Sequence, residues 1–178
     1  MFEVEVKAQV KDSEQLKRIL LGEGAKQLAT ERHVDHVYGI PSHFPPENGE
    51  VIARIREKDE KITFEFKEID RRAGGIELEN PISAVEPFHR FLLKMQFKHF
   101  FTMEKTRTSF LLNGLCICFD TIPELGSFIE IEKMVSKESE KESALKEVNS
   151  FLKLWAPDAV ICAEKYGDML CTKLCIKR

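Results

Sequence analysis

Charged residues recur in pairs at alternate positions of successive strand-like segments, and this pattern constrains the fold more than any other feature. The residue between the two charges is apolar in every pair except Lys105 and Arg107, where it is Thr106. The pairs are Glu3 and Glu5, Arg54 and Arg56, Glu65 and Lys67, Glu77 and Glu79, Lys105 and Arg107, and Glu130 and Glu132. Because successive side chains of a strand point to opposite faces, each segment has one apolar face and one charged face.

The order of the segments predicts an α+β fold that an antiparallel sheet dominates. Eight strands are expected, near 2–10, 26–40, 50–57, 61–69, 76–82, 99–112, 115–122 and 127–134. Helices are expected at 12–22, where Asp12 is the N-cap, and at 85–95, 139–155 and 164–175. The turn Asn113-Gly114 predicts a tight hairpin, Gly74-Gly75 opens the strand at 76–82, and the Pro-rich loop 41–49 is a candidate mobile segment.

Two structures fit this pattern. One is an open sheet with a solvated face, on which cross-strand ion pairs are common and contribute little. The other is a closed eight-stranded antiparallel β-barrel, a tunnel with a charged interior and with helices packed outside. Like charges two residues apart on one strand repel each other unless a cation lies between them, and this favours the charged tunnel.

The composition limits the classes of function. The 178 residues fit a single domain, 1–178, and 27 basic against 30 acidic residues give a net charge of −3. This balance excludes a strongly basic nucleic-acid surface. We expect no membrane partner, because no apolar run approaches 18 residues, and a cytoplasmic protein, because the N-terminus is acidic where a signal peptide is basic.

The cysteines and histidines carry no metal-binding motif. The five cysteines include no CxxC, although Cys116 and Cys118 point the same way on a strand and Cys171 and Cys175 lie four apart on a predicted helix. Two such pairs could bind a metal, but free cysteines are usually small buried hydrophobic residues, and we interpret them so. The five histidines are scattered, and we interpret them as structural or surface residues.

The charged positions resemble a known family. Glu3-Val4-Glu5-Val6-Lys7 is similar to the ExExK signature of the CYTH domain, the triphosphate tunnel metalloenzymes, and matching residues follow in order as far as about residue 155. They are Asp35, Tyr38, Arg54, Arg56, Lys67, Glu77, Glu79, Lys105, Arg107, Asp120, Leu125, Gly126, Phe128, Glu130 and Glu132. Within the family the chain looks most like the class IV adenylyl cyclases, although Lys165 and Met169 depart from the usual ending of that group.

The resemblance implies a tunnel that binds a nucleoside triphosphate or tripolyphosphate together with Mg²⁺ or Mn²⁺. The implied metal ligands are Glu3, Glu5, Asp120, Glu130 and Glu132. The implied phosphate-binding residues are Lys7, Arg54, Arg56, Lys67, Lys105 and Arg107. The implied catalytic residues are Glu3, Glu5, Lys7, Glu130 and Glu132, and Glu77 and Glu79 form a supporting acidic pair.

Three functions remain open at this point. The first is an adenylyl cyclase that converts ATP to cyclic AMP and pyrophosphate. The second is a hydrolase of tripolyphosphate, thiamine triphosphate or a nucleoside triphosphate. The third, a non-catalytic nucleotide or polyphosphate binder, explains the acidic residues less well, because an anion binder does not need Glu3, Glu5, Glu130 and Glu132. The resemblance also points to a homodimer, which no surface pattern in the sequence supports.

Overall fold

The computed structural model describes residues 2–69 and 77–177. They fall into two compact units, each made of two stretches of chain. Unit 1 comprises Met1–Glu31 and Thr106–Glu164, and unit 2 comprises Arg32–Lys105 and Lys165–Arg178. Two long strands, β2 (Lys26–Gly39) and β6 (Lys98–Leu112), pass from one unit into the other. The single domain expected from the chain length stays a prediction.

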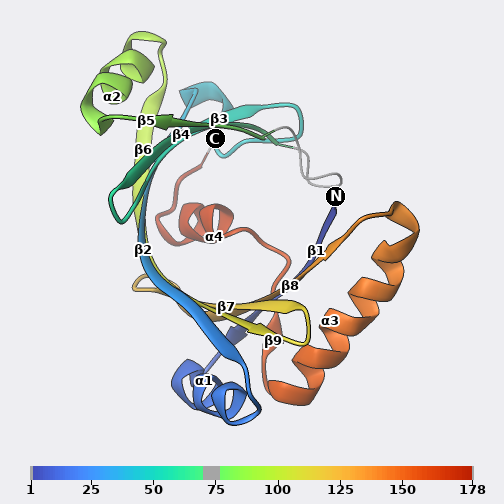
Figure 1. Cartoon of the computed structure of the whole chain (residues 1–178). Coiled ribbons are helices and arrows are strands. Elements are labelled where there is room, and N and C mark those ends of the chain that lie inside the picture. The colour runs from blue at the N-terminus through green and yellow to red at the C-terminus, as the bar shows by residue number, and fades with distance from the viewer. Residues whose placement is uncertain (1, 70–76, 178) are drawn as a thin grey trace. The chain divides into compact units, whose positions relative to one another are not determined.

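The strands form one nine-stranded antiparallel sheet in the order β5-β4-β3-β2-β6-β7-β8-β1-β9. Besides β2 and β6, the strands are β1 (Phe2–Val10), β3 (Val51–Lys58), β4 (Lys61–Glu68), β5 (Glu77–Ile82), β7 (Leu115–Ile122), β8 (Gly126–Val135) and β9 (Val160–Ile161). Figure 1 labels them. The α+β antiparallel class is confirmed, but the number of strands is nine rather than eight.

The added strand, β9, is too short to show a periodic pattern in the sequence. Its two residues pair with Ala8 and Gln9 at the free edge of β1. Over the described residues, the hydrogen-bonded order therefore ends at β5 on one side and at β9 on the other. The expected closure of the barrel by strand pairing is not found, and the tunnel stays a prediction.

Four α-helices accompany the sheet in the described ranges. They are α1 (Ser13–Gly22), α2 (Val85–Lys94), α3 (Lys141–Trp155) and α4 (Tyr166–Lys173), with short 3₁₀ turns at Pro41–His43 and Glu138–Glu140. As predicted, Asp12 caps α1: its side chain accepts a hydrogen bond of 2.8 Å from the Gln15 backbone N–H. The last helix is shorter than predicted. It ends before Cys175, whose φ of 55° is not helical, so Cys171 and Cys175 do not share a helix.

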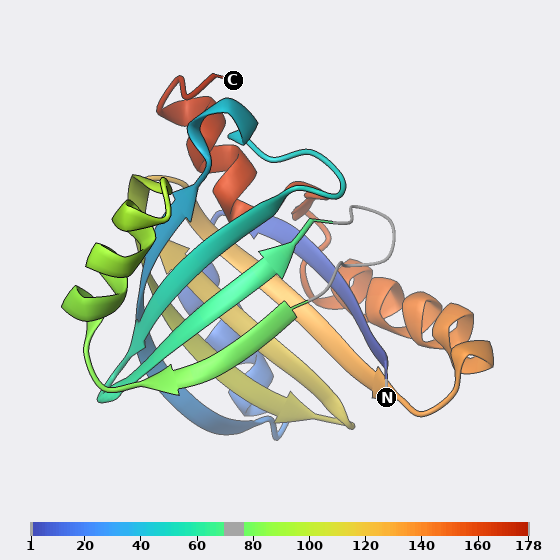
Figure 2. The same cartoon turned by 90° about the horizontal axis from the view of Figure 1, so that it is seen from above.

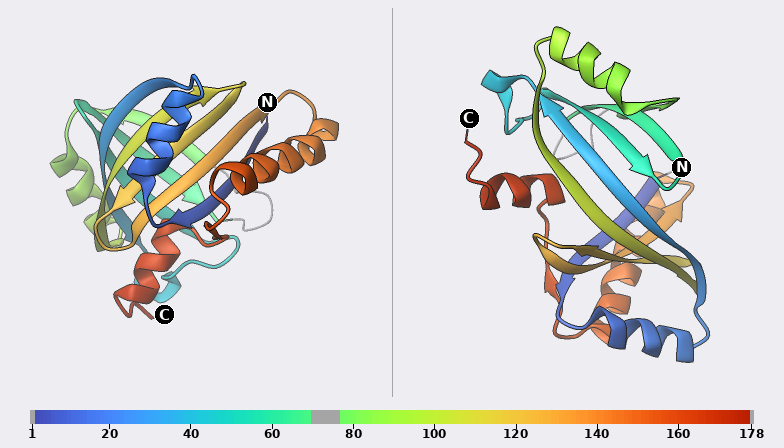
Figure 3. Two further views of the ribbon diagram at one scale, coloured as in Figure 1. Left: turned by 90° about the horizontal axis from the view of Figure 1, so that it is seen from below. Right: turned by 90° about the vertical axis from the view of Figure 1, so that its left-hand side faces the viewer.

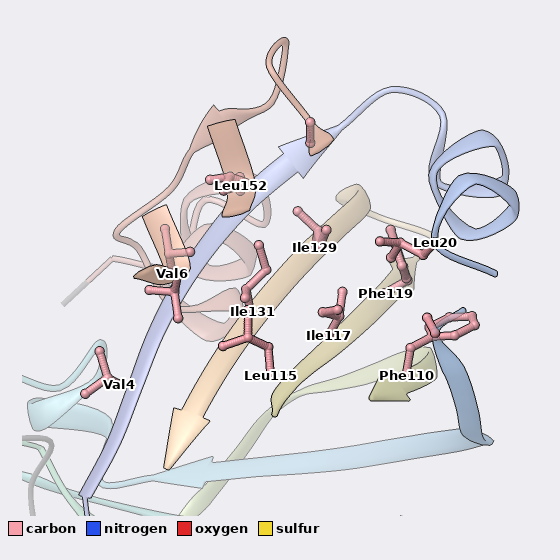
Figure 4. Packing of buried hydrophobic residues seen from close by; sticks show 14 of the residues in the cluster. Val4, Val6, Leu20, Phe110, Leu115, Ile117, Phe119, Ile129, Ile131 and Leu152 are labelled. Atoms are coloured by element: carbon pink, nitrogen blue, oxygen red, sulfur yellow. The ribbon is translucent and has the colours of Figure 1, made fainter. Parts of the chain in front are cut away.

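The apolar faces of the unit 1 strands form its core. Val6 of β1, Ile117 of β7 and Ile131 of β8 are at most 7% exposed and belong to one cluster with Leu20 of α1 and Leu152 of α3 (Figure 4). Helices α1 and α3 cover the same face of these strands (Figure 3, left). Strand alternation therefore directs Glu3, Glu5, Asp120, Glu130 and Glu132 to the face opposite the helices.

Unit 2 is built on the strand order β5-β4-β3-β2 (Figure 2). Leu92 of α2 packs with Tyr38, Ala53 and Ile55, which are all at most 1% exposed. The β3–β4 hairpin places Arg54 opposite Glu65 and Arg56 opposite Thr63. Arg54 and Arg56 therefore point to the face of β3 opposite to that of Ala53 and Ile55.

The tight hairpin at Asn113-Gly114 is confirmed: the φ values are 51° and 77°, as the turns that join closely paired strands require. Gly74-Gly75 lies outside the described residues. The loop 41–49 contains the 3₁₀ turn at Pro41–His43, and its mobility stays a prediction. In the described part of the chain, no helix is both long enough and apolar enough to cross a membrane.

Candidate functional site

The predicted acidic residues of unit 1 lie on neighbouring strands. Glu5 of β1 lies opposite Glu132 of β8, which lies opposite Cys116 of β7. In the adjacent row, Lys7 lies opposite Glu130, and Glu130 lies opposite Cys118. Cross-strand partners point to the same face. We call the five residues Glu3, Glu5, Asp120, Glu130 and Glu132 the carboxylate cluster.

Arg107 of β6 neutralises part of the carboxylate cluster. Its Nε and Nη2 donate to the two oxygens of Asp120 at 2.7 and 2.6 Å, and Nη2 also donates to Glu130. Asp120 is fully buried. Burial alone would lower the pKa of Arg107, but the hydrogen bonds and charge of Asp120, with the charge of Glu130, raise it above its usual value. In this structure Arg107, predicted to bind phosphate, is bound to carboxylates.

The other three carboxylates of the cluster lie close together. One oxygen from each of Glu3, Glu5 and Glu132 lies within 4.8 Å of the other two. Burial, Glu130 and Glu3 raise the pKa of Glu5, and burial raises the pKa of Glu132 to about 8, with Cys118 and Glu3 adding to the effect. A cation would offset the repulsion that adds to burial in raising these pKa values. Carboxylate oxygens are the ligands that Mg²⁺ and Mn²⁺ prefer, so the donor set fits the predicted metal.

The predicted basic residues of unit 2 are Arg54 and Arg56 of β3, Lys67 of β4 and Lys105 of β6, and we call them the basic cluster. Arg56 is held by a bidentate contact in which Nε and Nη2 donate to Asp35 of β2 at 2.6 and 2.7 Å. Asp35 is fully buried. Burial would raise the pKa of Asp35, but the hydrogen bond from Arg56 and the charges of Arg54 and Arg56 outweigh it and lower the pKa.

Two further members of the basic cluster, Arg54 of β3 and Lys67 of β4, are held by glutamates. Arg54 donates through Nε and Nη2 to Glu65, which is 1% exposed, and Lys67 Nζ donates to Glu77 Oε2 at 2.6 Å. Burial raises the pKa of Glu65 despite the opposing charge of Arg54. The hydrogen bond and charge of Lys67 lower that of Glu77 although burial acts against them. Glu79, its predicted companion, is exposed opposite Glu65.

Lys105 lies on β6, the neighbour of β2 in the sheet order. It is 6% exposed, and its Nζ lies 5.3 Å from the centroid of the ring of Tyr166. Tyr166 is the first residue of α4. An ammonium at this distance from a ring face makes a favourable cation–π contact. Tyr166 therefore has a polar role as well as a packing one.

Sequence reasoning missed two buried carboxylates, Asp35 and Glu65, as residues that position the arginines. Asp35 was matched to the family pattern without a role. The signal for Glu65 was available: a hairpin with its link at 58–60 places Glu65 opposite Arg54, and opposite residues share a face. In unit 1, the closeness of Cys116 and Cys118 to Glu132 was missed because it depends on the β7–β8 register.

The family model of the CYTH domain matches residues 1–159. The chain belongs to the CYTH domain family. A curated relative in sequence, "Putative adenylate cyclase" of Methanocaldococcus jannaschii, is 30% identical over 161 residues, which cover 86% of this chain and 89% of the relative.

Solved structures agree with this assignment. A protein of Pyrococcus horikoshii has 25% identity and a TM-score of 0.77, with 97% of this chain and 99% of that chain covered. A Hippeastrum protein has 16% identity and a TM-score of 0.65, with 97% of this chain and 96% of that chain covered. It is described as a putative adenylyl cyclase with a dominant triphosphatase activity. Its likeness to this CYTH chain concerns the fold alone.

Replacing Arg107 should destabilise the protein strongly, because Asp120 would remain buried without its main cationic partner. We expect Arg107→Gln to lower the free energy of unfolding by about 3 kcal/mol or more. The matched control is Arg32→Gln, which breaks the exposed pair of Arg32 with Glu104 and should cost at most about 1 kcal/mol. Urea denaturation measures both. Equal, small losses would contradict the role given to Arg107.

The protein should lose stability as the pH is lowered, because of His33, a 5% exposed residue of β2. Burial, with the charges of Lys105 and Arg56, lowers its pKa from 6.5 to about 4. Between these pH values His33 is protonated in the unfolded chain but not in the folded chain. The free energy of unfolding is therefore unaffected by His33 above about pH 6.5 and decreases as the pH falls towards 4. The gap in pKa corresponds to about 3 kcal/mol.

The variant His33→Gln isolates this effect. Urea denaturation across this pH range should show a smaller loss of stability on acidification in the variant than in the wild-type chain. The comparison uses the change with pH and not the absolute stability, so a general cost of the substitution does not affect it. An unchanged pH profile would contradict the assignment to His33.

Proposed function

We propose that this protein is a metal-dependent enzyme that acts on a triphosphate, and that its reaction is the conversion of ATP to cyclic AMP and pyrophosphate. The observation that carries the proposal is the group Glu3, Glu5 and Glu132, whose converging carboxylates favour a bound cation. Membership of the CYTH family supports the substrate class. The 30% identical relative, named as a putative adenylate cyclase, supports the choice of reaction.

The carboxylate cluster is proposed to hold Mg²⁺ or Mn²⁺. Glu3, Glu5 and Glu132 would be the ligands, while Arg107 orients Glu130 and Asp120 beside them. When bound, the cation would supply Lewis-acid stabilisation of the charge on the phosphate oxygens. Lys7, opposite Glu130 in the register, would be a second cationic residue beside this cluster, after Arg107.

The basic cluster is proposed to hold the phosphates. Guanidinium groups bind phosphate oxygens in the same bidentate way as carboxylates, so Arg54 and Arg56 suit this role. Asp35 and Glu65 hold both arginines in place before any ligand arrives. Such preorganisation lowers the entropy that binding must remove and aims positive charge at the position where negative charge develops.

In the proposed reaction the 3′-oxygen of ATP attacks the α-phosphorus. A bond forms between these atoms, the bond from the α-phosphorus to the bridging oxygen breaks, and pyrophosphate leaves while the hydroxyl proton passes to solvent. The positively charged residues stabilise the charge that accumulates on the leaving group, which is the main requirement of phosphoryl transfer.

Hydrolysis of a triphosphate is the second candidate. The residues of both clusters have chemistry for metals and phosphates, and none of them is specific for adenine. The same groups would serve a water molecule that attacks the terminal phosphorus. The closed tunnel, the homodimer, the cytoplasmic location and the lack of nucleic-acid and membrane partners stay predictions from the sequence.

Product analysis tests the proposal. The chain is incubated with ATP and, separately, with tripolyphosphate, in Mg²⁺ and in Mn²⁺, and the products are separated by ion-exchange chromatography. We expect cyclic AMP and pyrophosphate from ATP. Orthophosphate without cyclic AMP would reject the cyclase and assign the chain to the hydrolases. Absence of any turnover with both substrates and both metals would reject the proposal that the protein is an enzyme acting on triphosphates.

A pair of glutamate variants links the turnover to the carboxylate cluster. Glu132→Gln keeps the shape of the carboxyl group and removes a metal ligand. Substitutions around metal ligands cost about 10–100-fold, and loss of a ligand itself should reduce turnover by no less. The matched control is Glu147→Gln on α3, whose exposed carboxylate binds Lys133 and which should keep wild-type turnover. Equal turnover of the two variants would contradict the metal assignment.

A further inference from the structure

Two cysteine thiols lie beside the carboxylate cluster, on the charged face of β7. Cys116 Sγ and Cys118 Sγ are 3.7 Å apart. Cys116 lies opposite Glu132 in the β7–β8 register, and the two sulfurs and a Glu132 oxygen all lie within 4.8 Å of one another. Ser109 Oγ lies 3.4 Å from Cys118 Sγ on the other side. All of these residues belong to unit 1.

The distance between the sulfurs is the one that a shared metal ion requires. Zinc–thiolate bonds of about 2.3 Å at a tetrahedral angle put two sulfurs about 3.8 Å apart. A disulfide bond of about 2.05 Å is much shorter, and residues two apart on a strand have Cα atoms at about the upper limit for bridging. The strand therefore holds the two thiols close enough for an S–H···S hydrogen bond, at a separation that a shared metal ion also accepts.

We propose that Cys116, Cys118 and Glu132 bind one soft divalent cation, Zn²⁺ or Cd²⁺, in a site separate in chemistry from the one that takes Mg²⁺ or Mn²⁺. Each thiol gives its proton to solvent as its sulfur–metal bond forms. Three protein ligands leave a fourth tetrahedral position open. Thiolates select soft cations and disfavour Mg²⁺, so the two kinds of cation are distinguished by their ligands.

The surroundings suit such a cation. Two thiolates and a carboxylate carry three negative charges, so a divalent ion leaves a single negative charge on the site. Arg107 lies beside it, with Nη1 at 3.7 Å from Glu132 Oε1. The Ser109 hydroxyl is placed to donate to the Cys118 sulfur. Cys118 is buried, while Cys116 and Glu132 are partly exposed and give the ion a path from solvent.

Glu132 is common to this site and to the group with Glu3 and Glu5. Among residues 2–69 and 77–177, these are the two groups of three or more histidine, cysteine or acidic residues with ligand atoms this close. A soft cation on the thiols would thus take one carboxylate from the ligands proposed for the hard cation. Binding itself needs no turnover, so the inference stands or falls independently of the proposed function.

The test is a titration of the reduced full-length chain with Cd²⁺, followed by its ultraviolet thiolate-to-metal charge-transfer band. We expect the band to saturate at one Cd²⁺ per chain, and Zn²⁺ to displace it while excess Mg²⁺ does not. Cys116→Ser combined with Cys118→Ser should abolish the band. The matched control, Cys162→Ser combined with Cys175→Ser, removes two other accessible thiols and should keep it.

Glu132→Gln supplies a second readout. It leaves both thiols, so the band should remain, but the affinity for Cd²⁺ should fall about tenfold or more. Far-ultraviolet circular dichroism checks that each variant is folded; if the double serine variant is not, Cys116→Ser alone should weaken the band and the affinity. A wild-type chain without the band, or a band lost in the Cys162 and Cys175 variant but kept without Cys116 and Cys118, would overturn the proposal.

Discussion

Mutual repulsion of carboxylates on one face of a sheet is the constraint on which unit 1 depends. Strand alternation buries the apolar residues of β1, β7 and β8 under α1 and α3, and the same alternation forces the acidic residues together on the opposite face. Arg107 satisfies Asp120 and Glu130 through direct hydrogen bonds. Burial is the main reason that the pKa values of Glu5 and Glu132 are raised, and repulsion from neighbouring carboxylates adds to it; a bound cation would offset this repulsion.

In unit 2 the strands carry cations, and these need anionic partners. Its cations, Arg54 and Arg56, are buried far enough to need partners, and Asp35 and Glu65 supply them from the neighbouring strands β2 and β4. The result is a set of positive groups that cannot rearrange freely. A rigid basic cluster is of little use for stability alone, since buried ion pairs rarely stabilise a fold by themselves. It suits a ligand with several phosphate oxygens, which is why we give it the phosphate-binding role.

The sequence predicted those parts that depend on local periodicity. Eight of the nine strands, the cap at Asp12 and the turn at Asn113-Gly114 follow from alternation, capping and turn chemistry. What it missed depends on contacts between distant segments. The pairing of β9 with β1 involves two residues, too few for a pattern, and the early end of α4 left Cys175 outside the helix. The pairing of Asp35 with Arg56 and the closeness of Cys116 to Glu132 are fixed by strand register, which strand periodicity alone does not specify.

The central claim is that Glu3, Glu5 and Glu132 form a cation site, and calorimetric titration of the metal-free chain with Mn²⁺ tests it most directly. Because the pKa of Glu132 is about 8, the carboxyl group is largely protonated at neutral pH and must lose its proton to bind a metal. In buffers of different ionisation enthalpy, the account predicts Mn²⁺ binding with proton release that diminishes as the pH is raised past about 8. No binding of Mn²⁺, either at neutral pH or above pH 8, would contradict it.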